Sequence, residues 1–135
     1  MRRNLVLTIT SLLSVLFLTF HIADDIVRGF EKGQLWNLSA LPTLVLWLYG
    51  TVVLAERRSG YVIVILGSLL GLCIPVVHMS GRGLGGEIAK SSGAFFFIWT
   101  ILALGATSLF SLILSVRGLW TWRRSSAESC PSPSG

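Results

Sequence analysis

Apolar residues along this chain are grouped into four long stretches that contain few charged positions. They cover about residues 4–23, 40–55, 60–78 and 93–116. A helix needs roughly 20 mostly apolar residues to cross a bilayer. The second stretch is the shortest, so it needs its flanking residues or a tilt to cross. The pattern predicts an all-α integral membrane protein with four transmembrane helices.

The connections between the stretches determine how the predicted helices are arranged. The link at residues 56–60 is so short that the second and third helices must be antiparallel neighbours. We therefore expect an antiparallel bundle that occupies residues 1–124. Residues 125–135 contain Pro131 and Pro133 and have the composition of a disordered tail.

Composition supports a membrane location for nearly the whole chain. Of 135 residues, 53% are hydrophobic and 13% are charged, and the mean hydropathy is +0.75. About a quarter of the residues in a soluble domain are charged. The lipid bilayer is thus the predicted surrounding of this domain, and the sequence has no room for a separate soluble domain.

Basic residues are distributed unequally between the two sides of the predicted membrane. One side has seven, at Arg2, Arg3, Arg57, Arg58, Arg117, Arg123 and Arg124. The other has four, at Arg28, Lys32, Arg82 and Lys90. The positive-inside rule then places both termini in the cytoplasm of a multi-pass plasma-membrane protein. Basic residues beside a membrane set topology and contact anionic lipids, so the net charge of +5 does not indicate nucleic-acid binding.

Ionisable residues gather where the first apolar stretch ends, at His21, Asp24, Asp25 and Arg28. At helical spacing, three of them share one face with two hydroxyl residues: Thr10, Ser14, His21, Asp24 and Arg28. Such groups are costly in hydrocarbon and usually face a protein interior or a wet cavity. We therefore expect this face to point into the bundle.

A second histidine, His78, stands near the end of the third stretch, on the same predicted side of the membrane. Glu87 follows it in a glycine-rich loop. We predict that His21 contacts Asp24 or Asp25 and lies within reach of His78. Imidazole and carboxylate groups suit a divalent transition metal, with His21, Asp25 and His78 as ligands. They also suit a proton relay, or one b-type haem held by the two histidines.

A purely structural role for these groups competes with the ligand site. Carboxylates at a helix C-terminus meet the negative end of the helix dipole and need compensation. Arg28 lies four residues after Asp24 and three after Asp25, so an intrahelical ion pair would compensate one of them. Alternatively, Asp25 caps a new interfacial helix, and the dipole argument then reverses.

Small residues predict where the helices pack. Gly67 and Gly71 form a small-xxx-small pattern that allows close contact, inside the bundle or between two copies of the chain. A second ridge recurs every four residues at Ala103, Thr107, Ser111 and Ser115. Pro75 is expected to interrupt the third helix just before His78. A homo-oligomer, or a subunit of a larger membrane complex, is the expected assembly.

Three functions fit these features. The first is a non-enzymatic membrane subunit or scaffold, because polar groups are few and the loops are short. The second is a small proton- or cation-coupled transporter or channel, and the third is a membrane protein that binds a metal or haem. The sequence contains no evident nucleophile–base pair, which favours a role other than enzyme.

Overall fold

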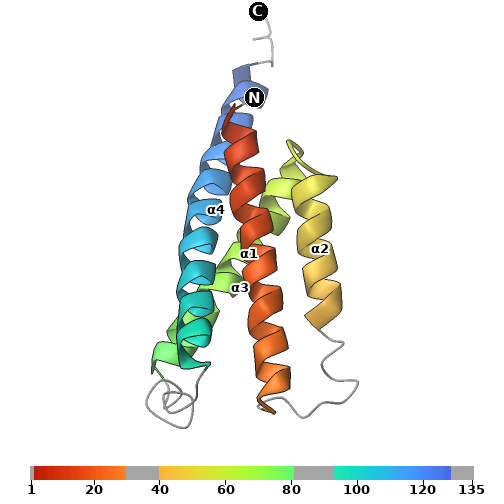
Figure 1. Cartoon of the computed structure of the whole chain (residues 1–135). Coiled ribbons are helices and arrows are strands. Elements are labelled where there is room, and N and C mark those ends of the chain that lie inside the picture. The colour runs from red at the N-terminus through yellow and green to blue at the C-terminus, as the bar shows by residue number, and fades with distance from the viewer. Residues whose placement is uncertain (1, 30–39, 81–92, 129–135) are drawn as a thin grey trace, which may run out of the picture.

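The computed structural model describes residues 2–29, 40–80 and 93–128, and all regular secondary structure within these ranges is helical. The helices are α1 (Arg2–Val27), α2 (Ala40–Val52), α3 (Arg58–Ser80) and α4 (Ala94–Glu128). They run alternately up and down, so the start of α1 and the end of α4 lie at the same end of the bundle (Figure 1). The expected all-helical fold is confirmed for this part of the chain.

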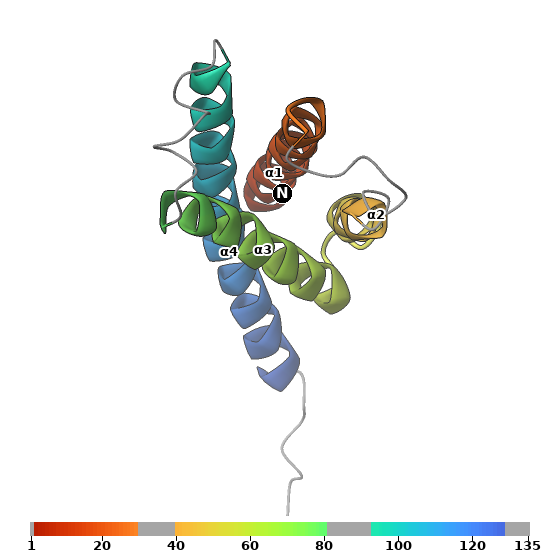
Figure 2. The same cartoon turned by 90° about the horizontal axis from the view of Figure 1, so that it is seen from below.

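The four helices form a ring that is narrow across one diagonal. Both α1 and α3 pack closely along α2 and α4, whereas the backbones of α2 and α4 do not approach each other. Seen end-on, α1 stands between α4 and α2, and α3 runs across α4 (Figure 2). The diagonal pair α1 and α3 also touch each other. The C-terminal ends of α1 and α3 both lie at the end of the bundle opposite to the termini (Figure 1).

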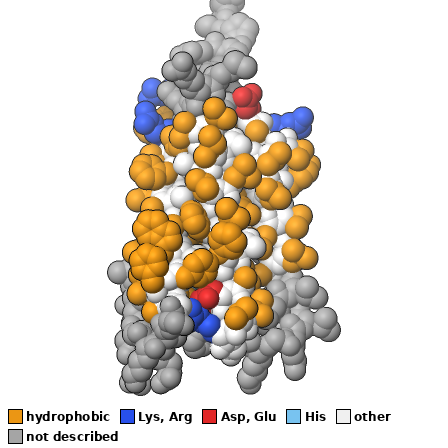
Figure 3. Space-filling model, in the orientation of Figure 1, with side chains coloured by type: hydrophobic (Ala, Val, Ile, Leu, Met, Phe, Trp, Pro, Cys, Tyr) orange, Lys and Arg blue, Asp and Glu red, His pale blue; other side chains and the backbone are white. Residues whose placement is uncertain are grey.

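Three of the helices are long and apolar enough to cross a membrane: Leu5–Val27, Arg58–His78 and Ala94–Arg124. The described part of α2 has 13 residues. At 1.5 Å per residue it is about 20 Å long, less than the roughly 30 Å of a hydrocarbon core. On the face drawn in Figure 3, apolar side chains cover the middle of the bundle, and charged side chains lie near its two ends. This is the surface pattern of a membrane-embedded bundle.

All four helices differ from their predicted bounds: α2 ends at Val52, not residue 55, α3 is two residues longer at each end, and α1 and α4 extend further still. Helix α1 continues to Val27, not residue 23, so both aspartates lie inside it. Helix α4 continues to Glu128, not residue 116, so residues 125–128 are helical although their composition predicts a disordered tail. No proline precedes Pro131 in this segment, and the stacking of Arg124 on Trp120 supports the additional turns.

Pro75 does not end α3, contrary to the prediction that it interrupts the helix. The helix continues from Arg58 through Pro75 to Ser80. Pro75 is buried, and its ring lies against Gly105 of α4, where the absence of a side chain leaves room for it. Neighbouring helices can accommodate a proline inside a membrane helix, which explains the continuity here.

Trp47 of α2 occupies the centre of the core and is 1% exposed. Its Nε1–H donates a hydrogen bond of 3.0 Å to Oγ of Ser11 in α1. The Ser11 hydroxyl is 2.7 Å from that of Thr51, which donates to the Trp47 carbonyl. Side chains at Gly67 and Gly71 of α3 would collide with the indole ring or with its neighbour Ser108. The glycine pair therefore packs inside the bundle.

The buried face of α4 differs from the predicted ridge. Ser111 and Ser115 are fully buried, but Ala103 and Thr107 are only half-buried. Residues four apart drift about 40° around a helix at each step, so a strict four-residue ridge leaves the interface. Steps of four, three and four residues stay on one face, and the buried line follows them through Leu104, Ser108, Ser111 and Ser115.

Candidate metal centre

The two histidines meet at the end of the bundle that is opposite to the chain termini. His21 lies one and a half turns before the end of α1, and His78 lies in the last turn of α3. The centroids of their rings are 4.9 Å apart, and the rings are nearly perpendicular at 83°. The diagonal contact between α1 and α3 produces this meeting. The predicted proximity of His21 to His78 is present in the structure.

His21 is a buried side chain, only 4% exposed. Its Nε2 is 3.4 Å from Oδ2 of Asp25, one turn later in α1. Its Nδ1 is also buried and has no hydrogen-bond partner among the described residues. A buried polar atom without a partner carries a desolvation cost that a ligand or a water molecule would remove.

His78 is half-buried and is oriented by its own helix. Its Nδ1 lies 2.9 Å from the carbonyl oxygen of Ile74. A carbonyl only accepts hydrogen bonds, so Nδ1–H is the donor and the lone pair of the ring is on Nε2. Histidines that bind metals commonly donate their other N–H to a carbonyl in this way. The arrangement leaves Nε2 of His78 able to bind an ion.

One ligand atom from each of His21, Asp25 and His78 can be chosen so that all three lie within 4.8 Å of one another. Two ligands about 2 Å from a zinc ion, at the tetrahedral angle, are about 3.4 Å apart. The side chains must therefore close in by roughly an ångström around an ion. Small rotations of the three side chains can supply this movement, because His78 and Asp25 are not fully buried.

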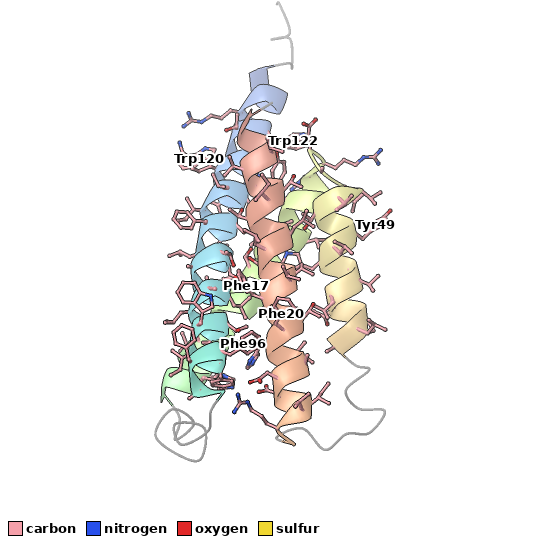
Figure 4. The ribbon with its side chains drawn as sticks, in the orientation of Figure 1. Phe17, Phe20, Tyr49, Phe96, Trp120 and Trp122 are labelled. Atoms are coloured by element: carbon pink, nitrogen blue, oxygen red, sulfur yellow. The ribbon has the colours of Figure 1, made fainter. Side chains whose placement is uncertain are left out.

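Phe97 of α4 forms the wall behind the two histidines. It is 1% exposed, and its ring centroid lies 5.7 Å from that of His21 and 5.5 Å from that of His78. A second aromatic contact nearby joins Phe20 of α1 to Phe96 of α4, which Figure 4 shows between the two helices. The wall fixes the imidazole rings and excludes water from one side of the site.

These ring contacts favour a single metal ion over haem. Two imidazoles that bind one haem iron lie on opposite faces of the macrocycle, which separates them. Here the rings of His21 and His78 touch edge to face, and Phe97 fills the space beside both. No space for a macrocycle is left between them.

Asp24 and Arg28 form an ion pair of their own beside the site. Nε of Arg28 donates to Oδ2 of Asp24 across 2.6 Å. The guanidinium group lies 5.8 Å from the centre of the Phe97 ring and against Gly93, just before the start of α4. The charge of one aspartate was expected to be balanced within its own helix, and Asp24 is the aspartate that Arg28 balances. Asp25 lies inside α1, so it does not cap a new helix.

Some site residues could not have been singled out from the sequence, and others lie outside the described part of the chain. Phe97 is one of three consecutive phenylalanines, and only its helical spacing with Ile101 and Leu104 marks it as inward-facing. Nothing in the sequence indicated that Gly93 would lie beside the site. Glu87, predicted to join the site, lies outside the described residues.

No known protein family, curated protein or solved structure matches the chain.

Proposed function

We propose that this chain is a small membrane protein that binds one divalent transition-metal ion through His21, Asp25 and His78. The convergence of their three ligand atoms within 4.8 Å is the observation that carries the proposal. The unpartnered Nδ1 of His21 and the carbonyl-oriented ring of His78 support it. The hydrogen bond of His78 to a backbone carbonyl is one that metal-binding histidines commonly make.

The ligand set indicates which ions fit. Two imidazoles and one carboxylate suit Zn²⁺, Fe²⁺ or Mn²⁺, whereas Ca²⁺ and Mg²⁺ prefer sites made entirely of oxygen atoms. Three protein ligands leave at least one position for water or another small ligand, unlike a closed structural site. One carboxylate balances half the charge of a divalent ion. The neighbouring Asp24–Arg28 pair is neutral and adds no net repulsion.

A cobalt titration tests the proposal directly. Purified protein in detergent should bind about one equivalent of Co²⁺ with visible absorption bands, and Zn²⁺ should abolish the bands by displacing the cobalt. Binding should weaken as the pH falls, because only neutral imidazole binds a metal. The variant Glu56→Gln removes a carboxylate from the opposite end of the bundle and should bind as the unaltered protein does. Absence of cobalt bands in the unaltered protein would contradict the proposal.

Membrane insertion with both termini in the cytoplasm is part of the same proposal. The three long apolar helices support insertion, and the cluster of arginines at the termini end supports the orientation. In this orientation, the metal centre lies near the outer surface of the plasma membrane. The described α2 would cross only together with flanking residues.

Labelling of Cys130 in intact cells tests the orientation. Cys73 is exposed on α3, so a Cys73→Ser background leaves Cys130 as the single thiol. An impermeant thiol reagent should then leave the protein unmodified until the cells are opened. Full modification of Cys130 in intact cells would contradict the proposed topology.

Cation transport is the second candidate function, and buried hydroxyl groups favour it. The hydroxyls of Ser68, Ser108 and Ser111 are buried in the core without hydrogen-bond partners among the described residues. Buried polar atoms of this kind commonly bind internal water, which could carry protons or cations through the bundle. Zinc-dependent proton flux into proteoliposomes would favour transport, and metal binding without any flux would favour a static role as a subunit or scaffold.

A further inference from the structure

The last turns of α4 carry a second group of polar side chains, far from the metal centre. Arg117, Trp120, Thr121 and Arg124 line a surface recess of about 280 Å³. Their spacing of three, one and three residues puts them on one side of the helix. Figure 4 shows Trp120 and Trp122 pointing to opposite sides of α4, with Trp120 directed away from α1. The recess therefore opens outward.

Within the described side chains, the two arginines of this recess have no ion pair. The ion pairs His21–Asp25 and Arg28–Asp24 lie at the other end of the bundle and involve neither Arg117 nor Arg124. Arg124 instead stacks on Trp120, with its Cζ atom 5.1 Å from the ring centroid. This cation–π contact holds one guanidinium group over the recess and leaves its N–H donors available.

The recess lies at the depth where lipid headgroups would be. Gly118 of α4 packs against Tyr61 in the first turn of α3, so the following residues of α4 pass the start of α3. Helix α4 projects beyond the other helices at this end (Figure 1). Trp120 is 61% exposed, and an exposed indole at a helix end is typical of the membrane–water interface.

We propose that this recess binds the phosphate headgroup of an anionic phospholipid. Two guanidinium groups two turns apart on one face can donate to phosphate oxygens from both sides. The Trp120 ring would lie against the glycerol and upper acyl chain, which a free phosphate lacks. This inference depends on membrane insertion but not on metal binding, and cobalt and lipid titrations distinguish a failure of one from a failure of the other.

Native mass spectrometry of the full chain in detergent tests the proposal. The protein is titrated with equal amounts of dioleoylphosphatidylglycerol and dioleoylphosphatidylcholine, and the first bound lipid is identified. We expect the unaltered protein to prefer the anionic lipid several-fold. The double variant Arg117→Gln/Arg124→Gln should show almost no preference. Both side chains are exposed, so the variant should keep its helical content, which circular dichroism verifies.

A matched control variant distinguishes a specific lipid-binding site from general attraction by positive charge. Arg57→Gln/Arg123→Gln removes the same charge from the same end but leaves the recess intact, and it should keep the preference. An equal loss in this control would overturn the proposal, as would an unchanged preference in the recess variant. Displacement of the bound lipid by excess inorganic phosphate would also overturn it, because the site would then recognise a soluble anion.

Discussion

Replacing either histidine with asparagine should lower the affinity for Co²⁺ by more than about 100-fold. Loss of a residue that only orients a metal ligand commonly costs 10- to 100-fold, and loss of the ligand itself should cost more. His21→Asn and His78→Asn should therefore have similar effects, although the two residues come from different helices. Isothermal titration calorimetry or spectroscopic titration of the purified proteins measures the Co²⁺ affinity of both variants.

The double variant distinguishes a shared site from two separate ones. If His21 and His78 bind one ion, the second substitution removes a ligand from a site that the first has already disabled. The combined loss of binding free energy should then be clearly smaller than the sum of the single losses. Purely additive losses would contradict a shared ion.

The two neighbouring aspartates provide a control within the same helical turn. Asp25→Asn should likewise weaken cobalt binding by more than about 100-fold, because it removes the proposed carboxylate ligand. Asp24→Asn should change it much less, since Asp24 is engaged with Arg28 at 2.6 Å. An equal loss in both variants would indicate that general negative charge, and not a ligand at Asp25, attracts the ion.

Topology made the meeting of the two histidines predictable. His21 and His78 each stand near the end of an apolar stretch, and the alternation of helix directions puts both ends on one side. Sequence spacing could not decide which aspartate faces the histidine. Both are near His21 at helical spacing, and the choice depends on the position of Arg28 against Gly93 and Phe97 of another segment.

The sequence predicts that each helix has a buried face, but it predicts less well which residues lie on that face. On α1, Thr10 was predicted to face the core, but it is half-buried and its hydroxyl donates to carbonyls of its own helix. The adjacent Ser11 is fully buried, and Trp47 of α2 donates to it, whereas the predicted Ser14 is buried as expected. One residue corresponds to about 100° around a helix. Such an error cannot be corrected without the neighbouring helix, since lipid-facing and core-facing positions are both apolar in a membrane protein.

Trp47→Ala should cause the largest loss of stability of any single substitution in the core. Removal of a buried aromatic side chain commonly costs 3–5 kcal/mol. We expect about 3 kcal/mol, because burial in a membrane bundle contributes packing and not transfer from water. The indole fills the space over Gly67 and Gly71, and those glycines cannot fill the cavity left behind. Equilibrium unfolding in mixed detergent micelles measures the free energy of unfolding.

Two further variants separate packing from hydrogen bonding at this position. Trp47→Phe keeps most of the packing but loses the bond to Ser11, a loss of about 1 kcal/mol. Ser11 would keep its contact with Thr51 at 2.7 Å, so no buried hydroxyl is left unpaired. Trp99→Ala removes the same side chain from α4 where it is 59% exposed, and it should change stability little. A Trp99 variant as unstable as Trp47→Ala would mean that the outer face of α4 is covered by another protein surface, such as a second copy of the chain, and not by lipid alone.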